Sequence, residues 1–211
     1  MLRNSQADPA WLIRMIDARE TDMDPQSRPY ASLRDLEAYA DETQGALLMF
    51  LLDSVVLPQS SEQAEACMTY AGRAIGLTTL LRGFVFHASR GDCYLPLDIL
   101  SKHELTVSEA MKAGATKAQG HHGAGMNSAK SLSSVIFDVA SLANAYAEDS
   151  AKLWSSLPSA AKPAILPLVA SQIWLESLQK HNFDMNKAQL HSTIPRIQLH
   201  WRLLQTSFAT A

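Results

Sequence analysis

Cysteine is scarce in this sequence, with two thiols, Cys67 and Cys93, among 211 residues. Two cysteines supply neither the set of bridges that small secreted domains need nor the ligand spacing of a structural zinc site. Because free cysteine is among the residue types most often buried, we expect both thiols to lie unpaired in a core. The count excludes a disulfide-stabilised scaffold and suits a reducing compartment.

Long apolar runs are also missing. The longest, GALLMFLLDSVVL at residues 45–57, is interrupted by Asp53 and falls short of the ~20 residues that cross a bilayer. The opening stretch MLRNSQADPAW has neither the apolar centre of a signal peptide nor a long Arg/Ser-rich amphipathic segment. We expect no membrane span. No targeting peptide is visible, so either the protein stays where it is made or a leader lies outside this numbering.

Positive charge is not concentrated in any segment. The formal net charge is -3, and no Lys/Arg cluster is interleaved with aromatic residues, so nucleic acid is not an expected partner. The sequence has no P-loop, no dinucleotide-binding fingerprint, no G-x-S-x-G motif and no internal repeat. Apolar residues make up 47% and charged residues 18%, as in packed globular proteins, and we expect one domain over residues 1–211.

Apolar residues recur at steps of three, four and seven along most of the chain, which is the periodicity of helices. No segment alternates with a period of two, so we expect an all-α bundle of antiparallel helices. A Gly-rich segment at about 114–130 predicts a mobile surface loop. In the first helix, Trp11, Ile13 and Ile16 supply the apolar surface. Helix starts are expected at Asp8, Ser32, Ser61, Thr106 or Ser108, near Ser131, near Ile165 and after Pro195.

Acidic residues provide one spacing that could serve metal chemistry. Glu37 and Asp41 lie one helical turn apart, as two carboxylates must if a helix presents both to Mg²⁺ beside a diphosphate. Further acids gather between Asp17 and Asp24. Solvated charges on a helix face are the commoner explanation for both groups. The adjacent His121 and His122 lie in the Gly-rich segment without a cysteine or carboxylate nearby, so they give no ligand pattern.

Residues 72–96, GRAIGLTTLLRGFVFHASRGDCYLP, resemble the second signature motif of the squalene/phytoene synthase family. That motif reads roughly G-x-A-x-Q-L-T-N-I-L-R-D-V-x-E-D, followed by a basic turn and Y-L-P. The resemblance implies an isoprenoid-synthase-like helical bundle. It extends from about Trp11 to Arg202 and does not include the family's N-terminal portion, which carries the first aspartate motif. The matching positions are Gly72, Ala74, Leu77, Thr78, Leu81, Arg82, Arg90, Tyr94, Leu95 and Pro96.

The resemblance places the two magnesium-bridging aspartates of the motif at Gly83 and His87. Glycine offers no ligand, and neutral imidazole is a poor ligand for a hard cation beside phosphate oxygens. Metal-assisted ionisation of a diphosphate is therefore expected to fail, and no metal or cofactor is expected. Arg82, Arg90 and Tyr94 are candidate remnants of the phosphate-binding pocket, although surface salt bridges are the commoner use of two such arginines.

Within the family, the segments LEAYADETQGALL and IFDVASLANAYAEDSAKL are most similar to members that act in the assembly of mitochondrial respiratory complex I, the NADH:ubiquinone oxidoreductase. This similarity implies a non-catalytic scaffold at the matrix face of the inner membrane, compatible with peripheral membrane association. Its expected partners are complex I subunits or other assembly factors.

Two alternatives stay open. One is an active prenyl-diphosphate synthase of the squalene/phytoene type that uses Glu37, Asp41 or the acids between Asp17 and Asp24. The other is an isoprenoid- or lipid-binding module in which Gly76 and Gly83 leave room for the apolar chain of the ligand.

Overall fold

The computed structural model describes residues 7–55, 60–115, 126–187, 190 and 199–203. Within these ranges the chain forms helices and no strand, which confirms the all-α prediction. None of these helices combines the length and the apolar character that crossing a bilayer requires. Residues 199–203, after Pro195, are helical as expected.

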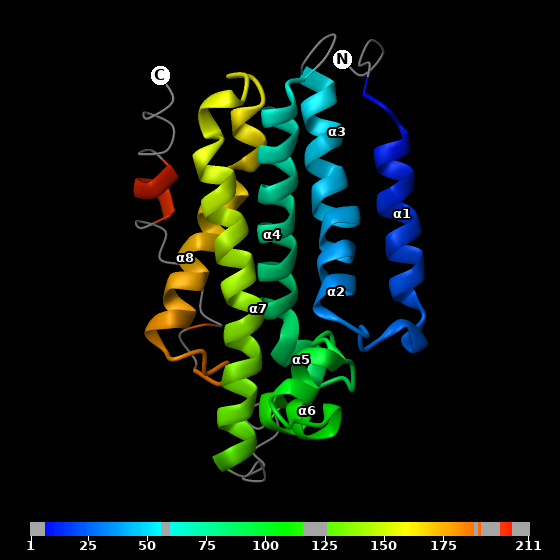
Figure 1. Ribbon diagram of the computed structural model, residues 1–211, viewed down its shortest axis with the longest axis vertical. Coiled ribbons are helices and arrows are strands. Elements are labelled where there is room, and N and C mark those ends of the chain that lie inside the picture. Colours follow the sequence, from blue (N-terminus) through cyan, green and yellow to red (C-terminus); the bar gives the residue numbers. More distant parts are fainter. Residues whose placement is uncertain (1–6, 56–59, 116–125, 188–189, 191–198, 204–211) are drawn as a thin grey trace.

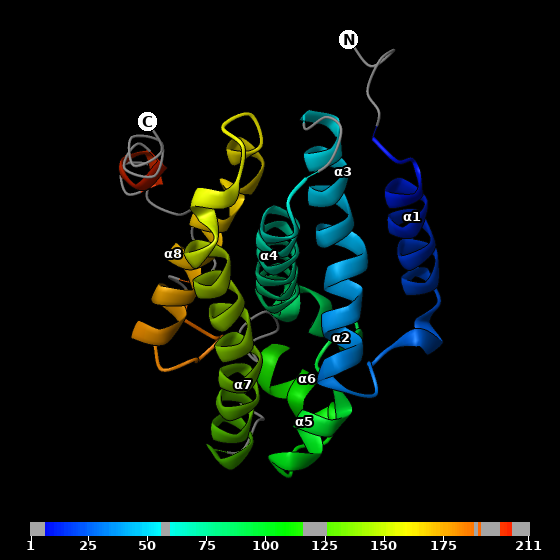
Figure 2. The same cartoon turned by 45° about the horizontal axis from the view of Figure 1, so that its top comes forward.

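Helix α4 (Glu62–Ala88) lies at the centre of the bundle (Figure 1). Helix α7 (Met126–Lys152) packs along one side of it, and α2 (Leu33–Ala40) and α3 (Ala46–Val55) follow one another along the other side. Helix α1 (Ala10–Met23) lies outside the α2–α3 pair, as the tilted view in Figure 2 also shows. The remaining elements are η2 (Pro25–Ser27), η3 (Asp41–Gly45), α5 (Leu97–Lys102), α6 (Val107–Ala115), η4 (Trp154–Ser156), η5 (Lys162–Ile165) and α8 (Pro167–Lys180).

Three of the predicted helix starts, at Ser32, Ser61 and Thr106, are capped as the sequence suggests, whereas α7 begins at Met126 and not near Ser131. Ser32 forms a reciprocal capping box with Asp35, which satisfies backbone N–H groups at the start of α2. Ser61 accepts a hydrogen bond from the backbone N–H of Ala64 at 3.2 Å. Thr106 and Glu109 form the same reciprocal arrangement before α6. These local contacts fix where the chain enters each helix.

The expected long helix from Ser32 to Val55 is continuous, but a π-helical turn, η3, separates α2 from α3. At this turn the Thr43 hydroxyl donates to the carbonyl of Tyr39 at 2.7 Å. Gly45 lies at the end of the turn, and a Cβ on Gly72 of α4 would come within 2.4 Å of the Gly45 Cα. Glycine on both helices therefore lets their backbones touch, since no real Cβ fits that distance.

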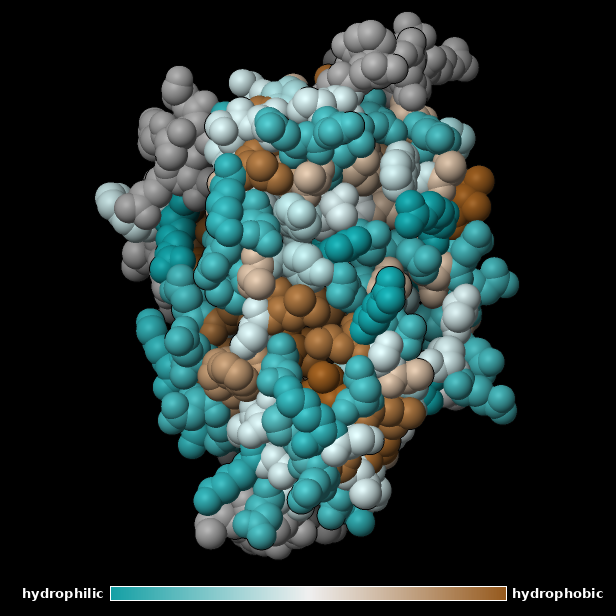
Figure 3. Space-filling view, viewed as in Figure 1, coloured by the Kyte–Doolittle hydropathy of each residue, from teal (hydrophilic) through white to brown (hydrophobic). Residues whose placement is uncertain are grey.

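Buried side chains form two apolar clusters on α4. One surrounds its C-terminal half and includes Phe84 with residues from α5, α6, α7 and α8. The other surrounds its N-terminal half and includes Leu52 of α3. Cys67 and Cys93 are free and buried, as predicted. On the face shown in Figure 3 the surface is mainly hydrophilic, with an apolar hollow between α7 and α2.

Two predictions need correction. The loop predicted at about 114–130 overlaps two helices, because α6 continues to Ala115 and α7 begins at Met126. Gly114 is helical and packs against Phe84, where an added Cβ would come within 2.5 Å of the ring. In α1, Ile13 and Ile16 do not face the bundle and are 55% and 59% exposed. Residues 116–125, with both loop histidines, lie outside the described residues.

Candidate functional site

The two motif positions, Gly83 and His87, lie one turn apart near the C-terminal end of α4. The imidazole of His87 folds back over Gly83, so that a Cβ on the glycine would be 3.0 Å from its Cδ2 atom. The ring also packs against Tyr94, with 4.6 Å between the ring centroids. Burial lowers the pKa of His87, which favours a neutral ring at pH 7. This face of α4 is thus occupied by an uncharged ring.

Beside His87, Arg28 and Asp22 form a compact polar cluster. Asp22 comes from the last turn of α1, and its Oδ2 atom accepts hydrogen bonds from the hydroxyls of Tyr39 and Tyr94, both at 3.1 Å. Arg28 donates to the Tyr94 hydroxyl at 2.9 Å, and its guanidinium carbon lies 4.9 Å from the centroid of the Tyr94 ring. Its side chain is 11% exposed and lies 3.7 Å from Asp22 and 3.4 Å from Asp92. We call Asp22, Arg28, Tyr39, Asp92 and Tyr94 the Arg28 cluster.

The connector between α1 and α2 brings Arg28 to this place. Asp24 and Pro25 end α1, because the residue before a proline is held out of the helical region. The connector then pairs with the start of α5 through a backbone hydrogen bond from Leu97 to Tyr30, at 2.9 Å. Arg28 is thereby fixed beside the turn that follows α4, although about 60 residues of chain separate Arg28 from that turn.

The phenols of the Arg28 cluster act as donors. Burial and the nearby Asp22 carboxylate raise the pKa of Tyr94 to about 12, and they raise the pKa of Tyr39 further. Both rings therefore stay protonated and direct their O–H groups at Asp22. Among the described residues, Asp22 Oδ1 and Arg28 Nε have no hydrogen-bond partner, so their contact is ionic only.

A second cluster involves Glu37 and Asp41, which the sequence suggested were solvated charges. That interpretation is wrong, because both carboxylates are about three-quarters buried and bind Arg73 of α4. Arg73 Nη1 lies 3.2 Å from Glu37, and Arg73 Nε donates to Asp41 at 3.2 Å. The hydroxyl of Tyr146 in α7 donates to the same Glu37 oxygen, and the Arg73 guanidinium lies 5.5 Å from the Tyr146 ring centroid. We call Glu37, Asp41, Arg73 and Tyr146 the Arg73 cluster.

Arg82 and Arg90 do not make the surface salt bridges that were the commoner expectation. Both side chains are exposed, and neither takes part in an ion pair with the residues described here. The Arg90 guanidinium instead stacks on Phe86, 4.0 Å from the ring centroid. The structure therefore brings Tyr94 into the polar cluster beside His87 and leaves both arginines on the surface.

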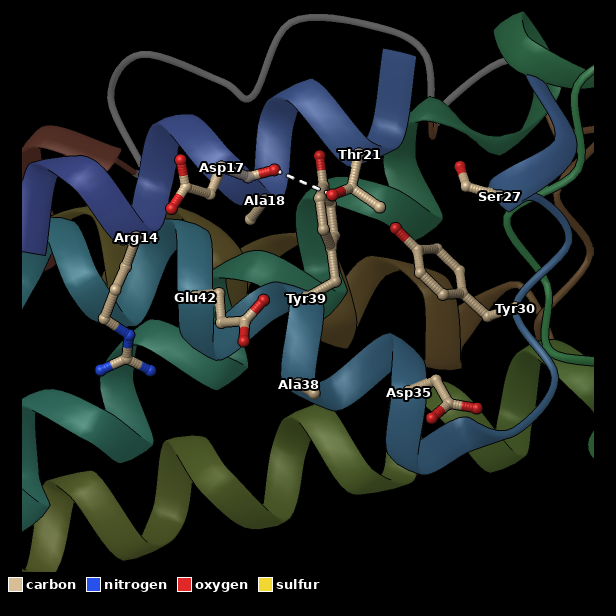
Figure 4. A pocket seen from close by; sticks show the side chains of 10 residues that line it. All are labelled: Arg14, Asp17, Ala18, Thr21, Ser27, Tyr30, Asp35, Ala38, Tyr39 and Glu42. Carbon is tan, nitrogen blue, oxygen red and sulfur yellow. Dashed lines mark hydrogen bonds between the residues drawn. The ribbon is translucent and has the colours of Figure 1, made fainter. Parts of the chain in front are cut away.

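A cavity of about 340 Å³ opens between α1 and α2, next to the Arg28 cluster (Figure 4). Neither Gly83 nor His87 lines it. Within the described ranges, no group of three or more His, Cys, Asp or Glu side chains is arranged to hold a metal ion. The cavity is lined by Arg14, Asp17, Ala18, Thr21, Ser27, Tyr30, Asp35, Ala38, Tyr39 and Glu42.

Sequence reasoning missed Arg28 and Arg73 as partners of the acids. Arg73 lies three residues before Gly76 in the recognised motif, so the sequence predicts that both are on one helix. Nothing in the sequence indicates that Arg73 faces Glu37 and Asp41. Arg28 follows a turn whose direction depends on tertiary contacts. Gly76 was expected to leave room for a ligand; a Cβ there would come within 2.6 Å of Ala40 Cβ, so α2 already fills that space.

The helical bundle and the motif on α4 define the class of protein. The family model for squalene/phytoene synthase matches residues 1–205, and the chain belongs to this family. Among solved structures, it resembles a dehydrosqualene synthase in complex with ligand, with a TM-score of 0.77 and 15% identity over 98% of this chain and 66% of that one. A squalene synthase from Alicyclobacillus acidocaldarius gives 0.67 and 13% identity over 84% and 61% of the two chains. These likenesses show the fold.

Curated relatives carry a different name. The chain is 31% identical over 175 residues to the NADH dehydrogenase (ubiquinone) complex I assembly factor 6 of Rattus norvegicus, covering 83% of this chain and 47% of the relative. The human protein of that name is 29% identical over the same length, and the Drosophila melanogaster homologue is 26% identical over 200 residues, 94% of this chain and 55% of that protein. The chain thus spans about half the length of the curated relatives it matches.

Proposed function

We propose that this protein is a non-catalytic member of the squalene/phytoene synthase family that acts in the assembly of mitochondrial respiratory complex I. The names of its relatives support this role. Its site of action is then the mitochondrion, at the matrix face of the inner membrane, and its partners are complex I subunits or other assembly factors.

The proposal that the protein is non-catalytic rests on one observation: carboxylates are missing at the motif positions of α4, and those beside His87 are paired with arginine. At the motif positions, Gly83 and His87 present no carboxylate. Acids beside His87 belong to the Arg28 cluster, where one guanidinium already pairs with both Asp22 and Asp92. A metal ion would have to displace that guanidinium and leave it buried without a counter-charge, which costs several kcal/mol, on the order of 3–5. The chain's own arginine thus stands where a metal-dependent enzyme needs free carboxylates.

In both alternative functions, residues that would do the work are already engaged by other parts of the chain. A synthase built on Glu37 and Asp41 would need to release both from Arg73. A lipid-binding module that relies on Gly76 would need the space that Ala40 occupies. Glu37, Asp41 and Gly76 therefore support neither alternative.

Deletion of the gene in the organism that carries it tests the proposal. Native-gel activity staining should show loss of assembled complex I, and the wild-type gene should restore it. Restoration by Arg28→Lys but not by Arg28→Met would show that the protein needs the positive charge of the Arg28 cluster. Normal complex I in the deletion strain would refute the assembly role.

A further inference from the structure

The C-terminal half of α4 carries a positive surface that the proposed function does not use. Between Glu65 and Asp92 the chain has no acidic residue, while it has Arg73, Arg82 and Arg90. Arg73 is neutralised by the carboxylates of Glu37 and Asp41. The positive charge that remains on this segment therefore belongs to Arg82 and Arg90.

These two arginines flank an exposed aromatic ring. Arg82 and Phe86 lie one helical turn apart and share a face of α4. Phe86 is 53% exposed, and the Arg90 guanidinium lies over its ring at 4.0 Å. Arg82 and Phe86 of α4, together with Arg90 just after its C-cap, form an exposed row, which we call the α4 stripe.

We propose that the α4 stripe is a docking surface for an acidic segment of a partner protein. This inference rests on the proposed assembly role, which requires such a partner, and it names the surface that the partner contacts. Two exposed arginines without a carboxylate partner in the described part of the chain are electrostatically complementary to Asp and Glu side chains. Lys102 and Lys152, by contrast, are each paired with an aspartate of this chain.

The composition of the stripe favours a protein over a lipid surface. Arginine and aromatic side chains are enriched where protein interfaces concentrate their binding energy. Sites for anionic membranes commonly contain clusters of about four to eight basic residues, and the α4 stripe has two. The stacked Phe86 and Arg90 also lose little side-chain freedom on binding, because the contact already orients both.

Site-specific photo-crosslinking tests the docking surface. A photoreactive phenylalanine analogue replaces Phe86 in the full chain, expressed in its own cells, and the crosslinked peptide is sequenced. We expect an Asp/Glu-rich segment of a complex I subunit or assembly factor. Arg82→Glu with Arg90→Glu should reduce the crosslink at least ~tenfold, because two attractive contacts become repulsive. Arg34→Glu, an exposed arginine on α2, is the matched control and should leave the yield unchanged.

A charge swap separates lost docking from a damaged fold. Lysines in place of the acids of the crosslinked segment should restore the crosslink to the Arg82→Glu, Arg90→Glu variant. A crosslink to lipid, to a segment without acids, or one unaffected by the double charge reversal would overturn the inference while leaving the assembly role intact. Normal complex I after gene deletion, together with a charge-dependent crosslink to an acidic protein, would refute the assembly role alone.

Discussion

The Arg28 and Arg73 clusters each place one arginine between two carboxylates, but they stabilise it differently. In the Arg73 cluster both carboxylates lie 3.2 Å from the guanidinium, and the side chains remain about one-quarter exposed. In the Arg28 cluster the arginine is 11% exposed and its carboxylates are farther away, at 3.7 and 3.4 Å. Two tyrosine hydroxyls complete that cluster by donating to Asp22.

The difference shows how the fold stabilises charged side chains at two depths below the surface. Near the surface, two short ion pairs and one hydroxyl donor, that of Tyr146, suffice because water is nearby. Deeper in the bundle, a charge needs several hydrogen bonds as well, because an incompletely paired ion there is costly. The Arg28 cluster also joins three parts of the chain, namely α1, α2 and the turn after α4. We therefore expect it to contribute more to stability than the Arg73 cluster.

The largest expected effect is that of Arg28→Met. The substitution leaves the buried Asp22 without its cation, whereas water reaches Asp92, and it should lower the free energy of unfolding by about 3–4 kcal/mol. Chemical denaturation of purified protein measures the change. Arg34→Met removes an exposed arginine from α2 and is the control, with an expected change within about 0.5 kcal/mol. A loss under about 1 kcal/mol for Arg28→Met would mean that the Arg28 cluster does not contribute more to stability than the Arg73 cluster.

Gly72→Ala should rank second. The added methyl group meets the backbone of Gly45 and pushes η3 away from α4, which also separates Asp41 from Arg73. We expect a loss of about 2–3 kcal/mol in the same unfolding measurement. Gly91→Ala is a matched control, since nothing lies within 4 Å of its Cβ position; its positive φ of 86° predicts a smaller loss, about 1 kcal/mol, from backbone strain alone. Equal losses for the two variants would argue against contact between the helices.

Arg73→Met should cost less, about 1.5 kcal/mol, because water reaches the carboxylates it leaves behind. A double-mutant cycle with Asp41→Asn sharpens the comparison. In the Asp41→Asn background the loss caused by Arg73→Met should shrink, since one of the two ion pairs is already gone. An unchanged loss would mean that Arg73 stabilises the fold through packing against Tyr146 instead.

The smallest effect concerns His87 and pH. Because burial lowers the folded-state pKa of His87 below 6.5, the unfolded chain binds its proton more readily. The neutral ring's contribution to the free energy of unfolding is fully present above pH 6.5. It decreases as the pH falls through that value toward the pKa of the folded state. His87→Phe keeps a ring beside Tyr94 and removes the titration. The stability difference between wild type and variant should vary between pH 7 and pH 5; a constant difference would contradict the lowered pKa.

Much of the fold could be predicted from the sequence because it depends on local signals. Helical periodicity located the main helices, and Ser32 and Ser61 begin helices as their capping chemistry suggests. The outward position of Ile13 and Ile16 could not be predicted, since polar contacts also attach α1 to the bundle. Trp11 donates to Asp53 at 2.8 Å and Arg19 donates to Tyr39 at 3.0 Å, and hydrophobic periodicity does not detect such contacts.

The candidate site was predicted less completely. The motif on α4 identified Gly83 and His87, and the structure places the His87 ring against Tyr94 of the Arg28 cluster. The arginines that neutralise the acids come from distant parts of the chain, so spacing along the sequence could not pair them. Glu37 and Asp41 do face the same way from one helix, as their spacing predicts, but they bind Arg73 of α4.

The central claim is that arginines of this chain occupy the carboxylates on which metal-dependent prenyl chemistry would rely. The most direct test is an assay of pyrophosphate release by the purified protein with Mg²⁺ and farnesyl or geranylgeranyl diphosphate. The account predicts no release above that of a protein-free control. Release that depends on both the protein and Mg²⁺, and that is lost when Glu37 and Asp41 are changed to their amides, would contradict it.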